Sequence, residues 1–166
     1  MTEPGNKSVR VLLVDDEEDL VEFLTHRLVK RGFTVTATTA GADALVASAR
    51  QRYDVAIVDL KMPGMDGIAV LEQLKDHQPY LEAIILTGHG SHATALAAGR
   101  LQAFRYLLKP YEFDELVTLI EEAATAKRET MVREFQAAQA KIIAQGGTAR
   151  EISEASDRLR REYEQD

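Results

Sequence analysis

The sequence lacks cysteine altogether, so the chain can form neither a disulfide framework nor a metal site with thiolate ligands. It also lacks any apolar run long enough to cross a membrane. Residues 1 to 8 have no basic start followed by an apolar stretch, which is the pattern of a secretory leader. We therefore expect a cytoplasmic protein with no membrane partner.

An excess of basic residues is absent as well. The net charge is −7, and it arises from residues 1 to 125, which carry 19 acidic and 12 basic side chains, whereas residues 126 to 166 carry 8 of each. Neither part would attract nucleic acid by long-range electrostatics. With 45% hydrophobic and 28% charged residues, the composition is typical of a globular domain. We expect an N-terminal tail over 1–8, one domain over 9–125 and an extension over 126–166.

Five apolar segments alternate with five segments of helical periodicity. The sequence predicts strands over 9–14, 33–37, 55–58, 83–86 and 103–108, and helices near 20–28, 42–49, 68–74, 93–101 and 113–123. Strand-then-helix units in succession favour an α/β fold, in which a five-stranded parallel sheet has helices on both faces.

Polar residues follow four of these predicted strands. They are Asp15 and Asp16 after the first, Asp59 after the third, Thr87 after the fourth and Lys109 after the fifth. The carboxyl ends of parallel strands meet at one rim of a sheet, which is where open α/β sheets bind ligands. Clustered carboxylates repel one another unless a cation such as Mg²⁺ is present, and lysine with a hydroxyl suits a phosphoryl group.

Ordinary roles compete with some of these assignments. The acidic residues Glu17 to Asp19 fit a helix N-terminus, where negative charge is favourable. His89 and His92 are spaced to share a helix face, but no third metal ligand accompanies them. An aromatic strand residue such as Tyr106 is usually a packing residue.

Together these residues resemble the receiver domain of bacterial two-component response regulators, over residues 9 to about 125. The resemblance depends on motifs at four strand ends: Asp15-Asp16, Asp59 before the turn Lys61-Met62-Pro63-Gly64-Met65-Asp66-Gly67, Thr87, and Lys109-Pro110. It implies a flavodoxin-like, doubly wound (βα)5 fold with a C-terminal helical extension.

The resemblance also implies roles for individual residues. Asp59 would be the phosphoacceptor, and Thr87 and Lys109 would each contact a phosphoryl oxygen. Mg²⁺ would be the cofactor, bound directly by Asp16, Asp59 and the backbone carbonyl of Lys61, with Asp15 acting through water. The chain would be no enzyme beyond its own phosphorylation and dephosphorylation.

A conformational switch and a set of partners follow from the same resemblance. Thr87 drawn toward the phosphate would leave space for Tyr106 to rotate, and the Lys109-Pro110 bond would be cis. The partners would be a histidine kinase or phosphotransfer protein and a downstream protein target.

Three positions would affect the structure or the dephosphorylation rate of such a domain. Many receivers have glycine where this chain has Gln102, so either the preceding helix ends early or Gln102 takes an unfavourable conformation. Lys61 and His89 occupy positions that tune the dephosphorylation rate in the family.

Residues 126 to 166 are too few for a winged-helix or helix-turn-helix domain. Met131, Phe135, Ala138 and Ile142 continue the apolar stripe of the fifth helix to about residue 144. Gly146-Gly147 must end that helix, and Thr148 with Glu151 forms a capping box before a second apolar face at Ile152, Ala155, Leu159 and Tyr163. We expect a helical hairpin or a coiled coil that forms a homodimer; the competing interpretation is a helix without a partner.

Two other functions compete with the phosphoacceptor. The first is a receiver-fold adaptor that is never phosphorylated, which would be marked by loss of a site residue. The second is a haloacid-dehalogenase-like phosphatase with Asp59 as nucleophile, which needs a second aspartate where this chain has Lys61. A nucleotide-binding site is excluded because no glycine-rich loop follows the first strand.

Overall fold

The protein folds around one five-stranded parallel sheet with strand order β2-β1-β3-β4-β5. The strands are β1 (Arg10–Val14), β2 (Thr34–Thr38), β3 (Val55–Val58), β4 (Glu82–Thr87) and β5 (Arg105–Leu108). The structure, a computed structural model, describes residues 8–64, 66–88, 96, 99–100 and 102–164, with side chains to residue 161. The predicted α/β class and parallel sheet are confirmed.

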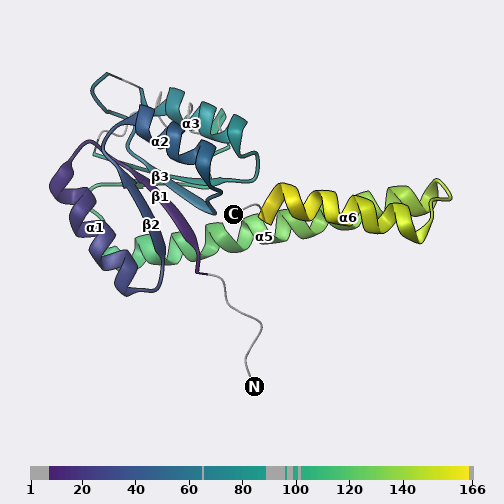
Figure 1. The fold of residues 1–166 in the computed structure, drawn as a ribbon. Coiled ribbons are helices and arrows are strands. Elements are labelled where there is room, and N and C mark those ends of the chain that lie inside the picture. The colour runs from purple at the N-terminus through teal and green to yellow at the C-terminus, as the bar shows by residue number, and fades with distance from the viewer. Residues whose placement is uncertain (1–7, 65, 89–95, 97–98, 101, 165–166) are drawn as a thin grey trace.

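Helices cover both faces of this sheet (Figure 1). Helices α1 (Glu18–Lys30) and α5 (Phe113–Ala144) pack on one face, and α2 (Gly41–Arg50) and α3 (Gly67–His77) pack on the other. Side chains of the central strands alternate between the two cores: Val11 and Leu13 join α1 and α5, whereas Leu12 and Val14 join α2 and α3. This double coverage explains why the inner strands are continuous apolar runs.

The connection between β4 and β5 is only partly described. The helix predicted over 93–101 lies mostly outside the described residues, as do His89 and His92. Gln102, at the end of this connection, has a φ of 54°, so the second of the two predicted outcomes at this position is the observed one.

Replacement of Gln102 should therefore stabilise the protein. We expect Gln102→Gly to raise the free energy of unfolding by about 0.5 to 1 kcal/mol, because relief of a left-handed conformation exceeds the added chain entropy of glycine. Urea denaturation measures this change. Gln102→Ala is the control, since alanine keeps the strained Cβ, and equal stability of the glycine and alanine variants would contradict the explanation.

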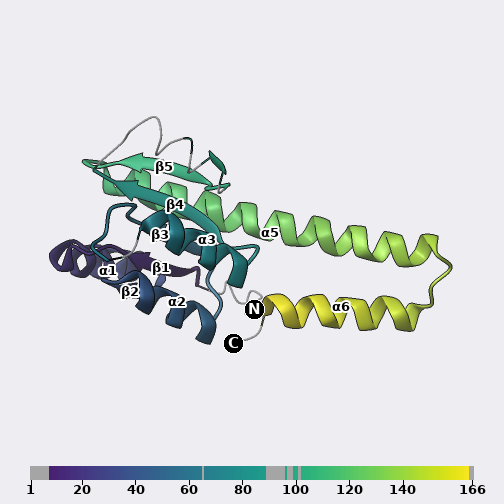
Figure 2. The ribbon, with the colours of Figure 1, turned by 90° about the horizontal axis from the view of Figure 1, so that it is seen from above.

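Helix α5 continues far beyond the sheet and forms a hairpin with α6 (Ala149–Glu164), as both ribbon views show (Figures 1 and 2). The turn is made at Gly146, whose φ is 73°. Thr148 and Glu151 form the predicted capping box: the Thr148 N–H donates to Glu151 Oε2 at 2.6 Å, and the Glu151 N–H donates to Thr148 Oγ1 at 3.3 Å. No helix in the described part of the chain has the length and apolarity to span a membrane.

A buried lysine fastens the extended part of α5 to the sheet. Lys127 Nζ donates to the carbonyl oxygen of Tyr53 at 2.7 Å and to Asp54 Oδ1 at 3.0 Å. Asp54 Oδ2 in turn accepts from the Arg10 N–H at 2.8 Å. Further along α5, Glu134 accepts a hydrogen bond from the Tyr80 hydroxyl. These contacts join the predicted extension over 126–166 to the predicted domain over 9–125. The division of the chain at residue 125 therefore stays a prediction.

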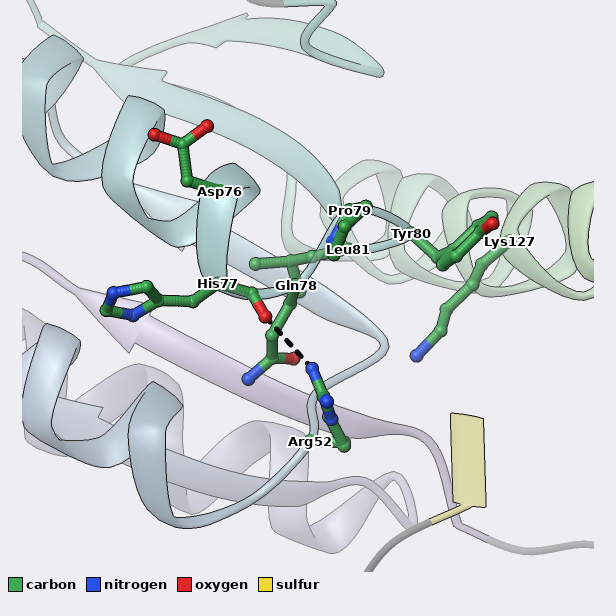
Figure 3. A pocket seen from close by; sticks show the side chains of 8 residues that line it. All are labelled: Arg52, Asp76, His77, Gln78, Pro79, Tyr80, Leu81 and Lys127. Atoms are coloured by element: carbon green, nitrogen blue, oxygen red, sulfur yellow. Dashed lines mark hydrogen bonds between the residues drawn. The ribbon is translucent and has the colours of Figure 1, made fainter. Parts of the chain in front are cut away.

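A pocket of about 250 Å³ lies beside this junction, and its lining residues include Arg52, His77, Tyr80 and Lys127 (Figure 3). It is at the amino-terminal edge of the sheet, opposite the predicted rim. Two of its cationic groups already have protein partners, because Arg52 donates to the His77 carbonyl at 3.0 Å and Lys127 is paired with Asp54. Arg52 and Lys127 therefore provide no unpaired cation for a ligand in this pocket.

Candidate phosphoryl-transfer site

The opposite, carboxyl-terminal rim brings together the polar residues that follow the strands. Backbone hydrogen bonds continue one residue beyond the regular ladder: the Asp15 N–H donates to Thr38 at 3.2 Å, the Asp59 N–H to Val14 at 2.9 Å, and the Lys109 N–H to Thr87 at 3.0 Å. The site residues are thus held by the sheet itself rather than by mobile loops.

The carboxylates of the site are largely removed from solvent. Asp15 is 1% exposed and Asp59 is 7% exposed, and Thr87 is fully buried at the end of β4. Asp59 follows a strand that is buried on both faces, and the chain turns sharply after it. Burial of two carboxylates requires compensating charge or hydrogen bonds.

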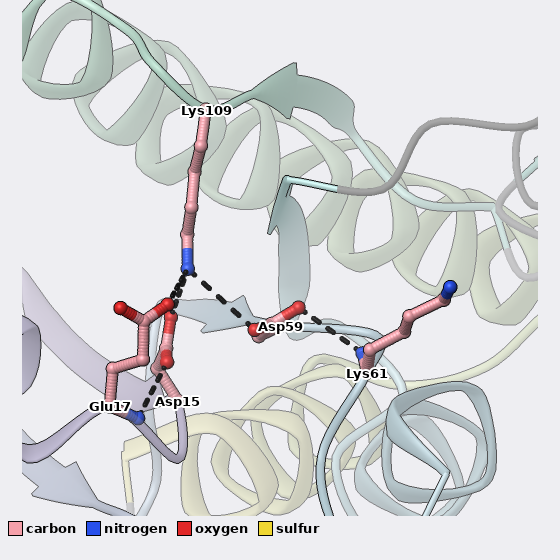
Figure 4. Close-up of polar contacts among 5 residues, drawn as sticks. All are labelled: Asp15, Glu17, Asp59, Lys61 and Lys109. Carbon is pink, nitrogen blue, oxygen red and sulfur yellow. Dashed lines mark hydrogen bonds and ion pairs between the residues drawn. The ribbon is translucent and has the colours of Figure 1, made fainter.

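Lys109 supplies that compensation. Its ammonium nitrogen lies 2.8 Å from Asp15 Oδ2, 3.1 Å from Glu17 Oε1 and 3.6 Å from Asp59 Oδ2. Figure 4 shows the lysine side chain reaching down between these three carboxylates. The predicted juxtaposition of Asp15, Asp59 and Lys109 is therefore present in the structure.

The electrostatics of this group follow from burial and pairing. Burial raises the pKa of Asp15 above its ordinary value, an effect that the hydrogen bond from Lys109 partly offsets. Burial alone would lower the pKa of Lys109, but its hydrogen bonds to Asp15 and Glu17 raise that pKa instead. The lysine consequently stays protonated throughout the physiological pH range.

Glu17 also belongs to this group, a position that the sequence alone did not predict. It precedes α1 as the N-cap residue but makes no side-chain cap hydrogen bond, and its carboxylate turns to Lys109 instead. Its own N–H donates to Asp15 Oδ1 at 3.0 Å. The prediction that Glu17 merely complements the helix N-terminus is therefore incomplete. Its position two residues after Asp15, at the same strand end, was the available signal.

Asp59 is connected to the turn that follows it. The Lys61 N–H donates to Asp59 Oδ1 at 3.2 Å, while the Lys61 side chain is exposed and points away from the carboxylates (Figure 4). Asp66 ends the turn as the N-cap of α3, and its side chain accepts from the Ile68 N–H at 3.1 Å. The turn thereby fixes the orientation of the Asp59 carboxylate and the residue at which α3 begins.

The oxygen ligands available for a metal differ in part from those implied by the resemblance. Within the described residues, Asp15, Glu17 and Asp59 offer carboxylate oxygens that all lie within 4.8 Å of one another. Asp16 is half-buried and is not part of this cluster, so a direct ligand role would require its carboxylate to move closer. Three clustered carboxylates are a donor set suited to a hard cation such as Mg²⁺.

The residues of the expected switch occupy neighbouring strands. Tyr106 on β5 lies opposite Ile85 on β4, and Thr87 lies opposite Leu108. Tyr106 is half-buried against a small core of Leu60, Leu71, Ala83 and Ile85, and burial raises the pKa of its hydroxyl. The Lys109–Pro110 bond is cis, the isomer that the resemblance implies.

A groove of about 450 Å³ opens beside Lys109. It runs between α1 and the segment that joins β5 to α5, and its lining includes Leu20, Phe23, Lys109, Tyr111 and Phe113. Phe23 is 54% exposed. The groove therefore joins an exposed aromatic surface to the charged group.

The sequence of this chain is similar to those of known proteins. Residues 11–121 match the sequence model of the response regulator receiver domain. The DNA-binding transcriptional regulator NtrC of Escherichia coli K12 is 40% identical over 119 residues, which are 72% of this chain and 25% of NtrC. The chain thus spans about a quarter of the length of the curated relatives it matches.

Solved structures give the same similarity. A response regulator receiver domain from Clostridium thermocellum is 31% identical with a TM-score of 0.68, covering 74% of this chain and 98% of that domain. The response regulator TrrA of Thermotoga maritima, solved in complex with Mg²⁺-BeF, is 29% identical with a TM-score of 0.63, covering 69% and 98% respectively.

Proposed function

Because this chain belongs to the response regulator receiver domain family, we propose that it accepts a phosphoryl group on Asp59 in a two-component phosphorelay. The observation that supports this most strongly is the buried carboxylate of Asp59, 3.6 Å from the ammonium of Lys109 and at the same rim as Thr87. A nucleophile, a cation and a hydroxyl at one rim are the groups that phosphoryl transfer needs.

The proposed reaction uses a phosphohistidine of a histidine kinase or phosphotransfer protein as donor. A carboxylate oxygen of Asp59 attacks phosphorus and forms an O–P bond while the P–N bond breaks. The electron pair of that bond remains on the donor imidazole, which leaves neutral when its other ring nitrogen carries the proton. Lys109 then balances negative charge on the transferred group, and the Thr87 hydroxyl donates to a phosphoryl oxygen.

The carboxylate cluster fits Mg²⁺ by its chemistry, since all of its donors are oxygens. Asp59 and the Lys61 carbonyl would hold the ion, together with Asp16 once its carboxylate has moved closer, and Asp15 would act through water. When bound, Mg²⁺ would neutralise charge on the phosphoryl oxygens. The clustered position of Glu17 makes it a further oxygen donor within reach of the same region.

A switch would carry the signal away from the site. Movement of Thr87 toward the phosphoryl group would open space beside β4, into which Tyr106 could turn from its half-buried position. The surface changed in this way includes β5 and the start of α5. Phosphorylation at Asp59 would thus alter a surface at which another protein binds.

The groove beside Lys109 supports a docking place for the phosphodonor. Asp59 is almost fully buried, so a donor histidine must approach along an open path beside it. The groove leads to Glu17 and Lys109, whose charged groups lie beside Asp59, and Phe23 is exposed at its edge. An exposed aromatic surface next to this charged group would hold the donor protein during transfer.

We propose that output passes through protein contacts of the hairpin formed by α5 and α6, including self-association. The relatives include DNA-binding regulators, but residues 126–166 carry equal numbers of acidic and basic side chains, a balance that does not favour binding to DNA. No residue described in the hairpin after Lys127 is fully buried, so its two helices lack a closed core. Val132 and Ile143 are 54% and 62% exposed on α5.

A charge on this exposed surface should weaken self-association. We expect Val132→Glu combined with Ile143→Glu to shift a dimer toward monomer, because two carboxylates would be desolvated in the interface. Sedimentation velocity measures the shift. The control is Arg133→Glu with Lys141→Glu, which changes exposed polar positions of the same helix. A wild-type protein that sediments as a monomer with and without phosphorylation would favour the helix without a partner.

The phosphoacceptor itself can be tested by NMR with the phosphoryl analogue beryllofluoride. We expect Mg²⁺ to shift the amide signals of Asp15 and Asp59, and beryllofluoride with Mg²⁺ to shift those of Asp59, Thr87 and Tyr106. Unmoved signals in folded protein would contradict the proposal and favour the adaptor.

A further inference from the structure

Glu17 is neither the nucleophile nor a phosphoryl contact in the reaction described above, yet its carboxylate lies within the charged group. Its Oε1 atom is 3.1 Å from Lys109 Nζ, a contact that joins residues 92 positions apart in the chain. An N-cap residue normally accepts a hydrogen bond from the first turn of its helix, but the Glu17 side chain does not. Its orientation is therefore explained by the lysine rather than by the helix.

The distances around Lys109 show how its hydrogen bonds are distributed. An ammonium group has three donors. Two go to Asp15 and Glu17, at 2.8 and 3.1 Å, whereas Asp59 lies at 3.6 Å, beyond hydrogen-bond range. The nucleophile is thus the carboxylate that Lys109 binds least closely.

The Glu17 backbone is fixed at this position. Its N–H donates to Asp15 Oδ1, while Asp15 Oδ2 accepts from Lys109, so Asp15 connects to Glu17 and to the lysine at once. The length of the glutamate side chain then determines whether its carboxylate reaches the ammonium. A shorter acid at this position would keep the charge but lose the contact.

We propose that Glu17 is a positioning residue that holds the ammonium of Lys109 beside Asp15 before transfer and competes with the incoming phosphoryl oxygen for it. This inference depends on the proposed function, since it describes regulation of the same site. Glu17 is 63% exposed and Asp15 only 2% at the side chain, so the Glu17 contact is the weaker and more readily released of the two. Glu17 thereby lowers the affinity of the site for a phosphoryl group.

The test measures the beryllofluoride concentration for half-saturation, by NMR, at Mg²⁺ concentrations that saturate each variant. We expect Glu17→Gln to lower this concentration about two- to fivefold, the range set by an exposed ion pair. Glu17→Asp should also lower it, because it keeps the charge but shortens the reach. The matched control is Glu18→Gln, which removes a neighbouring exposed charge from the first turn of α1 and should leave the value unchanged.

A second readout reports on the lysine directly. In protein labelled with ¹³C-lysine, the side-chain signal of Lys109 should shift in Glu17→Gln and Glu17→Asp without any ligand, and should not shift in Glu18→Gln. A residue that served only the stability of α1 would not produce this pattern.

Three results would overturn the inference. Equal binding by Glu17→Gln and Glu18→Gln would mean that Glu17 acts only through the helix. Tighter binding by Glu17→Gln with wild-type binding by Glu17→Asp would indicate a general charge effect. Weaker binding by Glu17→Gln would mean that Glu17 favours the bound state. Failure of the wild-type protein to bind beryllofluoride would instead contradict the proposed function, and this inference with it.

Discussion

Asp59→Asn should take up no phosphoryl group from acetyl phosphate and Mg²⁺ under conditions in which the wild-type protein does. The amide nitrogen and oxygen of asparagine replace the carboxylate that attacks phosphorus, so the nucleophile is lost. The remaining groups of the site, Asp15, Lys109 and Thr87, are anchored by the sheet and should keep their positions. Intact-mass spectrometry at short incubation times measures the uptake.

Asp66→Asn is the matched control for this variant. It makes the same chemical change seven residues away, and asparagine caps a helix about as well as aspartate does, so the start of α3 should be preserved. We expect uptake by Asp66→Asn to equal that of the wild type. Undiminished uptake by Asp59→Asn would mean that another carboxylate is the acceptor.

Gly67→Ala should destabilise the protein by about 3 kcal/mol or more, the upper part of the range for overpacking. A Cβ at Gly67 would lie 2.3 Å from the Asp59 carbonyl oxygen and 2.5 Å from Leu60 Cα, and both are backbone atoms that cannot turn aside. Helix α3 must therefore shift, or the backbone that positions Asp59 must shift. Denaturant unfolding measures the loss, and phosphoryl uptake should fall in the fraction that remains folded.

Gly99→Ala provides the comparison, because no atom of the described residues lies within 4 Å of a Cβ placed there. Its stability should match or slightly exceed that of the wild type, since alanine favours helix more than glycine does. If Gly67→Ala were as stable as Gly99→Ala, the close approach of α3 to the Asp59 backbone would not limit the side chain that residue 67 can carry.

Sequence periodicity was sufficient for the sheet because its central strands are buried on both faces. Strand β3 has the predicted bounds, and Val55 to Val58 are all buried. Strand β5 begins at Arg105 rather than at the predicted residue 103, because the chain is still turning after the left-handed Gln102. Edge strands also bury less surface, and a less regular apolar pattern defines their ends less sharply.

The candidate site was predictable to the extent that its residues lie at the carboxyl ends of strands. Asp15, Asp59, Thr87 and Lys109 meet because parallel strands end at one rim. Glu17 and Gly67 were not predictable in the same way, because their importance comes from contacts with Lys109 and with the Asp59 backbone. The role of Lys127 was not predictable either. Its sequence position indicates an ordinary helix residue, yet its side chain is buried against Tyr53 and Asp54.

The proposed function depends most on Asp59 as the residue that receives the phosphoryl group. The decisive measurement is peptide mapping of wild-type protein after incubation with Mg²⁺ and acetyl phosphate, with intact mass recorded first. We predict a labile gain of one phosphoryl group, localised to the peptide that contains Asp59 and absent when Mg²⁺ is chelated. Folded protein that gains no mass, or gains it on a peptide without Asp59, would contradict the account.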